Sequence, residues 1–139
     1  MSLRSPYQLV TAAPSVDDYI RLRIGSGLSL RTPEQAAAAI AGSWSFRYVV
    51  GPGGEPVGMG RVIGDGGWYF LIADMATLPD HQRRGIGAAV LDGLLDDIRT
   101  RAPRGAYVSL TADPPGRRLY ESRGFTDLGA AADAMLLYT

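Results

Sequence analysis

The spacing of apolar residues changes along the chain, and one change marks a strand followed by a helix. Residues 68–77 are extended and largely apolar, which is typical of a buried strand. After a short loop, apolar residues recur at the spacing of a helix. The inward positions of that helix are Ile86, Val90, Leu91, Leu94, Leu95 and Ile98. Pro103 ends it, because the residue before a proline disfavours the helical conformation.

The N-terminal part predicts one strand and two helices. Residues 6–13 predict the strand. Ser15 is suited to cap the first helix. The second begins after Thr32, where Gln35 completes a capping box, and Gly42 ends it. Both helices therefore carry their own start signals.

Three predicted strands follow one another through glycine-rich turns. They cover residues 44–50, 56–64 and 68–77, and the turns cover residues 51–54 and 65–67. Such short connections predict an antiparallel meander.

The C-terminal part returns to the sheet after the long helix. Residues 106–111 predict a strand parallel to residues 68–77, because strand–helix–strand connections are right-handed crossovers. Residues 113–122 predict a helix, and two closing strands are expected near Phe125 and across residues 134–138. The whole pattern predicts one α+β domain with a mixed sheet over residues 1–139.

Composition excludes several classes of protein. The chain has 139 residues, 46% apolar and 20% charged, which indicates a globular domain. Its 14 basic and 14 acidic residues leave no net charge, so nucleic-acid binding is not expected. There is no Cys, and His81 stands alone, so neither a disulfide framework nor a Cys- or His-based metal site is expected. No apolar run has membrane-spanning length, and a soluble cytoplasmic protein is the default expectation.

The loop at residues 82–88 is a candidate diphosphate site. A strand, a basic loop and a helix N-terminus in this order present backbone N–H groups to one point. Gly85 and Gly87 have no Cβ that would block a ligand, and Arg83 and Arg84 add positive charge. The alternative is an ordinary glycine turn, since short glycine motifs are weakly specific.

Other motifs are rejected. Residues 58–64 imitate a dinucleotide fingerprint, but their glycine spacing is wrong and no helix follows them. A phosphate-binding P-loop is excluded because the chain has no Lys. Ser and Thr residues lack a suitable His partner for a hydrolase triad.

Two segments carry a resemblance to a known family. Residues 82–87 read Gln-Arg-Arg-Gly-Ile-Gly, preceded by a matching strand and turn at residues 74–80. Residues 119–125 contain Tyr120 followed by Gly124-Phe125. The chain therefore resembles the GNAT superfamily of acetyl-CoA-dependent N-acetyltransferases over nearly its whole length. The resemblance implies a mostly antiparallel sheet with a central splayed parallel pair, flanked by helices.

The resemblance also implies how acetyl-CoA binds. The backbone N–H groups of residues 83–88 would bind the diphosphate. The pantetheine arm would pair with Met75 and Thr77, and the thioester carbonyl would meet an N–H group near Met75 or Ala76. The implied cofactor-binding residues are Met75, Ala76, Thr77, Gln82, Arg83, Arg84, Gly85, Ile86, Gly87 and Ala88. Asp113 stands where the family often has Asn, so it is either a cofactor contact or only a helix cap.

The resemblance makes Tyr120 the candidate general acid, because a phenol with a pKa near ~10 can protonate a departing thiolate. The alternative is that Tyr120 is only an aromatic residue of the core. For the general base, Asp74 is the first candidate and Asp65 the second, with a water chain as another route. Asp74 as a structural partner is an equally supported interpretation, and His81 is read as structural.

Acceptor specificity is expected from the early helices, the hairpin from Arg61 to Tyr69 and the last strands. The candidate residues for binding the acceptor are Arg23, Arg31, Trp68 and Tyr69. For each of them, a role in the fold or on the surface is the alternative interpretation. Arg117 and Arg118 could meet the ribose phosphate or could simply be solvated.

The expected function is direct transfer of an acetyl group from acetyl-CoA to a primary amine, that of a small molecule in the favoured interpretation. The alternatives are acetylation of a protein N-terminus or side chain, and a non-catalytic acyl-CoA sensor. No metal, nucleic acid or membrane is expected as a partner, and the family admits a homodimer.

Overall fold

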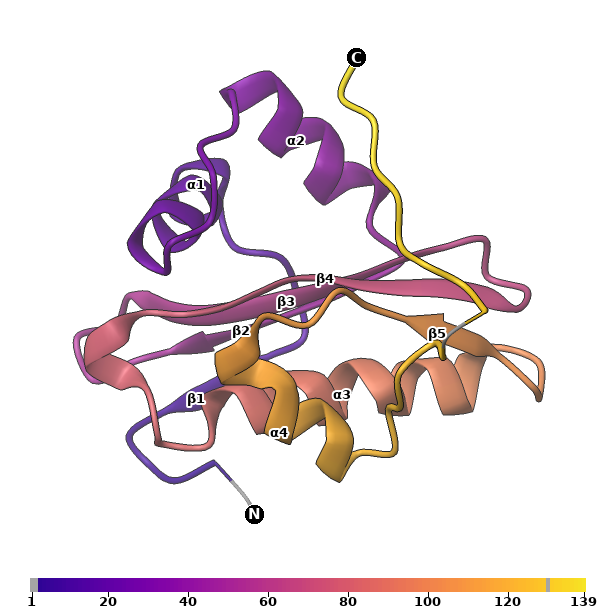
Figure 1. Cartoon of the computed structure of the whole chain (residues 1–139). Coiled ribbons are helices and arrows are strands. Elements are labelled where there is room, and N and C mark those ends of the chain that lie inside the picture. The colour runs from indigo at the N-terminus through magenta and orange to yellow at the C-terminus, as the bar shows by residue number, and fades with distance from the viewer. Residues whose placement is uncertain (1–2, 130) are drawn as a thin grey trace.

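The computed structural model describes residues 3–129 and 131–139, in which a five-stranded mixed sheet has helices on both faces (Figure 1). The strands lie in chain order across the sheet. They are β1 (Gln8–Val10), β2 (Ser45–Val50), β3 (Pro56–Gly64), β4 (Tyr69–Thr77) and β5 (Tyr107–Ser109). β1 to β4 are antiparallel neighbours, and β5 is parallel to β4. The predicted meander and the predicted parallel crossover are both confirmed.

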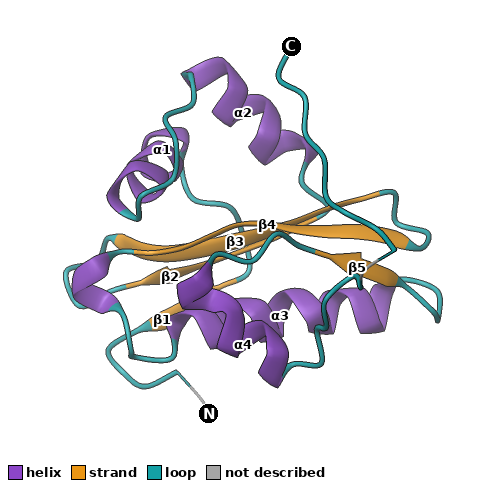
Figure 2. Cartoon of the chain, in the orientation of Figure 1, coloured by secondary structure: helices purple, strands orange, loops and turns teal. Residues whose placement is uncertain are grey.

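The helices form a layer on each side of the sheet (Figure 2). One layer contains α1 (Val16–Gly25) and α2 (Pro33–Gly42). The other contains α3 (Ile86–Arg101) and α4 (Arg117–Ser122). Two short 3₁₀ turns, η1 (Pro79–His81) and η2 (Pro114–Gly116), precede α3 and α4.

The predicted start signals of α1 and α2 are confirmed. The Ser15 hydroxyl accepts a hydrogen bond from the Asp18 N–H at 3.1 Å. Thr32 and Gln35 form the complete capping box, with each side chain accepting from the backbone of the other. Each bond satisfies an N–H group that has no partner within the helix.

Helix α3 packs its predicted apolar face on the sheet. All six of its inward residues are buried, and they form one core with side chains of β2, β3 and β4. Two glycines of β3 make this close packing possible. A Cβ on Gly58 would collide with Ile86, and one on Gly60 would lie 2.8 Å from Val90. Two of the three glycines that imitate a dinucleotide fingerprint, Gly58 and Gly60, therefore serve helix packing.

A β-bulge interrupts β4 opposite Gly60. Met59 pairs with Ala76 and Arg61 with Ala73, so two residues of β4, Asp74 and Met75, face one residue of β3. Asp74 has φ 56°, in the left-handed region. As a result, the Asp74 side chain meets Tyr19 of α1, whereas Met75 joins the core beneath α3.

Strands β4 and β5 are paired over only three residues. The pairs are Tyr69 with Tyr107, Phe70 with Val108 and Leu71 with Ser109. Beyond them β4 continues to Thr77, while β5 ends. The predicted splayed pair is present. From Ile72 to Thr77, the edge of β4 on the side of β5 has no partner strand among the described residues.

The two predicted closing strands are wrong. Neither the segment around Phe125 nor residues 134–138 form a strand. Arg117 and Asp127 form an ion pair that attaches the chain after Phe125 to α4 instead of β5. The final residues stay exposed, and Met135 and Leu137 are 95% and 84% exposed.

Two other predictions need smaller corrections. The first strand covers only Gln8–Val10, shorter than residues 6–13. The predicted helix at residues 113–122 is divided, because the chain makes a 3₁₀ turn at Pro114–Gly116 before α4 begins.

Candidate functional site

The N-terminus of α3 presents a row of free backbone N–H groups. In the described part of the chain, no backbone or side-chain group accepts a hydrogen bond from the N–H groups of residues 83–88. The first helical bond is that from the Ala89 N–H to the Gly85 carbonyl, at 3.0 Å. Arg83 and Gly85 both have a left-handed backbone, with φ 62° and 80°. Free N–H groups at the positive end of a helix dipole form an anion-binding site.

The loop is open to a ligand. A Cβ built on Gly85 would meet nothing within 4 Å, and one on Gly87 would only touch Leu119 at 3.4 Å. Arg83 and Arg84 are exposed, and the Arg84 guanidinium lies 6.0 Å from the centre of the Tyr7 ring. The loop therefore has the access and the positive charge that a diphosphate requires.

The free edge of β4 leads directly to this loop. Met75, Ala76 and Thr77 lie beyond the last pair with β5. The Gln82 side-chain amide is within 3.5 Å of the Thr77 carbonyl, which connects the loop to the strand end. Of the predicted cofactor residues, those from Met75 to Ala88 thus lie along one continuous path; their contact with acetyl-CoA remains a prediction.

Tyr120 lies on α4, half-buried, with its ring edge against Phe125. Burial, and then the negative charge of Asp113, raise the pKa of Tyr120 above its usual value. The phenol therefore stays protonated at neutral pH, as an acid must. Asp113 precedes η2, where its carbonyl accepts a hydrogen bond from the Gly116 N–H at 3.0 Å, but its side chain makes no capping hydrogen bond.

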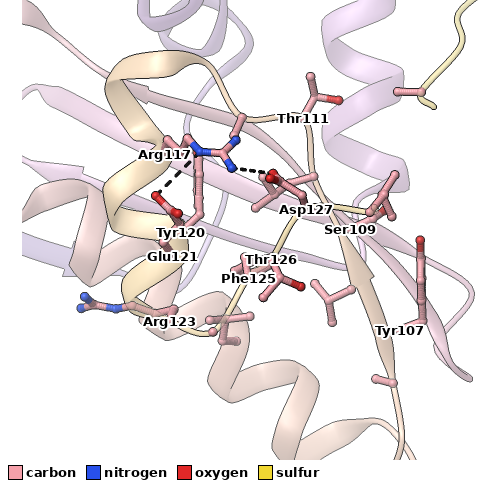
Figure 3. Close-up of a pocket in the computed structure, with 18 of the residues that line it drawn as sticks. Tyr107, Ser109, Thr111, Arg117, Tyr120, Glu121, Arg123, Phe125, Thr126 and Asp127 are labelled. Atoms are coloured by element: carbon pink, nitrogen blue, oxygen red, sulfur yellow. Dashed lines mark hydrogen bonds and ion pairs between the residues drawn. The ribbon is translucent and has the colours of Figure 1, made fainter. Parts of the chain in front are cut away.

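A hollow of about 670 Å³ lies beside β5 and α4 (Figure 3). Tyr120 and Arg117 line it, and so does the segment around Phe125 that was expected to form a strand. None of residues 74–88 lines it. We attribute this hollow to the absence of the two predicted closing strands, which would have covered the surface beside β5. The volume of the hollow is therefore no argument that the reaction takes place there.

Asp74 forms the centre of a polar cluster on the other face of the sheet. Its carboxylate accepts hydrogen bonds from the Tyr19 hydroxyl, from Arg23 and, at 2.7 Å, from Arg61 Nε. Its side chain is only 9% exposed. Because three donors already occupy its two oxygens, the Asp74 carboxylate is better explained as a structural partner of these side chains than as the general base.

A cavity of about 340 Å³ opens beside this cluster. It is lined by Tyr19, Arg23, Arg31, Gln35, Ala39, Arg61 and Asp74. Arg23 and Arg31, predicted as acceptor residues, are therefore brought together. The sequence did not identify Arg61 or Tyr19 as residues of the site. The pairing of β3 with β4, counted outward from the turn at residues 65–67, could have placed Arg61 beside Asp74.

The other candidates lie elsewhere. Asp65 accepts three backbone N–H bonds in the turn before β4, which lower its pKa and make it a poor base. Trp68 and Tyr69 both contact the ring of Tyr107 at the start of β4, roughly 25 Å from Thr77 along an extended strand. His81 is bonded to the Tyr7 hydroxyl at 2.8 Å. Asp65, Trp68 and Tyr69 thus lie away from the junction of β4 and α3, whereas His81 lies in η1, between the two, with its ring bonded to Tyr7.

The helices in the described residues include none with the length and apolarity needed to cross a membrane. Within the same residues, no group of three His, Asp or Glu side chains is arranged to hold a metal ion.

Comparison with known proteins agrees with this arrangement. A family model described as "Acetyltransferase (GNAT) domain" matches residues 43–127. A Staphylococcus aureus protein of unknown function, designated a probable acetyltransferase, has a similar crystal structure, with a TM-score of 0.89 and 31% identity over 96% of this chain and 99% of that chain. A GNAT-family acetyltransferase from Streptococcus pneumoniae shares the fold, with a TM-score of 0.75 and 22% identity over 96% and 97% of the two chains.

Among curated proteins, serotonin N-acetyltransferase 2 of rice (Oryza sativa subsp. japonica), a chloroplastic protein, is 31% identical over 85 residues. The match covers 61% of this chain and 42% of the length of the rice protein. Because this family model matches more than half of the chain, the chain belongs to the GNAT family of acetyltransferases.

Proposed function

We propose that the chain transfers an acetyl group from acetyl-CoA directly to the primary amine of a small molecule. One observation carries the proposal. The free N–H groups of residues 83–88 begin where the free edge of β4 ends, so one extended ligand can contact both.

In this arrangement the loop holds the diphosphate of coenzyme A. Its N–H groups donate to phosphate oxygens, and Arg83 and Arg84 contribute charge. The pantetheine arm extends along Met75 and Thr77, as an added strand would. The loop needs no rearrangement to accept the ligand, because its N–H groups are free and Gly85 has no close neighbour.

The chemical step is acyl transfer without a covalent enzyme intermediate. The neutral amine nitrogen attacks the thioester carbonyl, and an N–H group near Met75 or Ala76 stabilises the oxyanion. The carbon–nitrogen bond forms and the carbon–sulfur bond breaks. Tyr120 donates its proton to the departing thiolate, and the proton of the amine passes to water. The absence of Cys agrees with direct transfer.

The size of the cavity near Asp74 supports a small acceptor. Its volume of about 340 Å³ lies within the range of about 300–1,000 Å³ that is common for small-molecule sites. The cavity adjoins Asp74, which precedes Met75 in the strand, so an amine bound there would approach the thioester from the α1–α2 face of the sheet.

Two measurements test the proposal. Coenzyme A should raise the melting temperature of the protein, and the absence of any shift would exclude both the enzyme and the acyl-CoA sensor. Release of free thiol from acetyl-CoA should then depend on an added amine. Release with peptides alone would indicate a protein acceptor, and binding without release for any amine would leave a sensor.

A further inference from the structure

The cavity between α1, α2 and β4 carries an excess of positive charge. Three of the residues that line it are arginines, Arg23, Arg31 and Arg61, and Asp74 is the one acidic residue among them. The balance within this wall is therefore three positive charges against one negative, a net charge of +2. Figure 1 shows the face concerned, where α1 and α2 cover the sheet.

Arg23 and Arg61 share the single carboxylate. Arg23 donates to Asp74 and, through Nε and Nη2, to the carbonyl and hydroxyl of Ser29 at 3.0 and 3.1 Å. Arg61 donates through Nε to Asp74, and its Nη1 lies 3.3 Å from the Ser43 hydroxyl. One carboxylate between two guanidinium groups leaves one positive charge uncompensated.

Arg61 retains a free donor. No group in residues 3–129 or 131–139 accepts a hydrogen bond from its Nη2. Every fully buried side-chain nitrogen and oxygen in the same residues has a partner. The Nη2 group of Arg61 is therefore accessible from outside, and the cavity that Arg61 lines gives that access.

Arg31 is the second free donor. It is half-buried, and none of its nitrogens lies within 4.0 Å of a carboxylate of the described chain. Its single hydrogen bond is a long one, 3.4 Å, to the carbonyl of Leu30. Gln35, beside it, uses its side-chain oxygen in the cap of α2, which leaves the amide nitrogen as a donor.

We propose that the acceptor is a primary amine that also carries an anionic group, a carboxylate or a phosphate, which Arg31 and Arg61 bind in this cavity. The proposal rests on the proposed function and specifies its substrate class. Guanidinium groups bind both anions through paired N–H donors. The same positive charge disfavours the ammonium form of the substrate, which cannot attack a thioester. Serotonin has no anionic group, so the substrate class differs from that in the name of the rice relative.

Matched amine pairs test this class. Each pair differs only in the anion: 5-hydroxytryptophan and serotonin, phosphoethanolamine and ethanolamine, an α-amino acid and its amide. We expect a higher kcat/KM for the anionic member of at least one pair, measured by thiol release. The carboxylate and phosphate pairs distinguish the two sources of the anion. Equal or faster transfer to the neutral member of every pair would overturn the proposal.

Arg31→Ala is the informative variant, because Arg31 holds no other part of the fold through an ion pair. We expect KM for the anionic amine to rise about 10- to 100-fold, with kcat nearly unchanged, since hydrogen bonds to charged groups have this strength. KM for the neutral partner should not change, and Arg31→Lys should restore part of the affinity. Arg104→Ala, an exposed arginine between α3 and β5, is the matched control.

A binding measurement keeps this test separate from catalysis. With coenzyme A at saturation, so that the loop at residues 82–88 is filled, titration with inorganic phosphate or with acetate should shift the NMR signals of the Arg31 and Arg61 side chains. The shift of the Arg61 signal should be lost in Arg31→Ala. Binding of coenzyme A without such shifts would refute the anion site alone, whereas failure of coenzyme A to bind would refute the proposed function.

Discussion

Gly60 of β3 lies directly against Met75 of β4, with no room for a Cβ between them. The same missing Cβ would lie 2.8 Å from Val90 and 3.3 Å from Leu94 of α3. Gly60 therefore joins the β-bulge to the helix whose N-terminus forms the candidate diphosphate site. A methyl group at this single position would disturb both.

We expect Gly60→Ala to lower the free energy of unfolding by about 1–3 kcal/mol, the usual cost of an overpacked core. Urea denaturation measures this. Gly42→Ala, at the end of α2, is the control, because a Cβ there meets nothing within 4 Å. It should be neutral or stabilising, by up to about 1 kcal/mol. Equal stability of Gly60→Ala and the unmodified protein would contradict the packing described here.

The charge of the loop at residues 82–88 should govern coenzyme A affinity. Replacing both Arg83 and Arg84 with Glu should weaken binding by about tenfold or more, because two phosphate-attracting charges become repulsive. Melting without ligand should change little, since both side chains are exposed. Titration calorimetry measures the affinity, and Arg104→Glu serves as the control. An unchanged affinity would argue against diphosphate binding at this loop.

Tyr120→Phe should reduce turnover by about a hundredfold and leave coenzyme A affinity nearly intact, because only the proton donor is removed. Tyr107→Phe, an exposed tyrosine on β5, is the control. A Tyr120→Phe enzyme of normal turnover would remove Tyr120 from the mechanism.

The alkaline limit of activity should depend on Asp113. Burial and the charge of Asp113 raise the pKa of Tyr120, so loss of its proton should fall above about pH 10. Asp113→Asn removes the negative charge, and the pKa of Tyr120 should therefore fall. The titration of phenolate absorbance, compared with that of the Tyr120→Phe variant, measures the shift. If Asp113→Asn leaves that titration unchanged, the two groups do not interact.

Protonation of Asp97 at low pH should destabilise the fold. The Asp97 carboxylate, on α3, accepts a hydrogen bond from Arg47 Nη2 of β2 at 2.9 Å. Burial alone would raise the pKa of Asp97, but hydrogen bonds from Ser45 and Arg47 outweigh it and lower the pKa. A lowered pKa in the folded state means that the stabilisation is present above the unfolded value of about 3.9 and is lost as the pH falls further.

Asp97→Asn should cost about 3–5 kcal/mol near pH 7, because Arg47 would lose its charge partner while 8% exposed. Denaturation at several pH values should also show a weaker acid dependence than in the unmodified protein. Asp92→Asn is the control: the Asp92 side chain, paired with Arg123, is 45% exposed, so its loss should cost much less. An equal cost for both variants would contradict this ranking.

Sequence reasoning succeeded where local signals and long-range packing agree. Caps such as Ser15 and Thr32 act within a few residues, and the apolar face of α3 follows from its period alone. The glycine-bearing loop at the start of α3 was predictable for the same reason: its chemistry belongs to the backbone.

It failed where the outcome depends on partners distant in the chain. The closing strands have enough apolar residues, but no strand forms there, and an exposed ion pair between Arg117 and Asp127 links the segment to α4. The cluster around Asp74 depends on a bulge and on Arg61 and Tyr19, which no local pattern links. The cavity beside Asp74 was accordingly the part of the candidate site that the sequence predicted least well.

The β-bulge makes β4 sensitive to the number of its residues as well as to their kind. Plain alternation after Ile72, which packs under α3, would turn Asp74 towards that same apolar layer and Met75 away from it. Removing Met75 would thus bury the Asp74 carboxylate among aliphatic side chains and leave Arg23 and Arg61 without their shared anion. We therefore expect this short stretch to accept exchanges of side chain far more readily than any change of length.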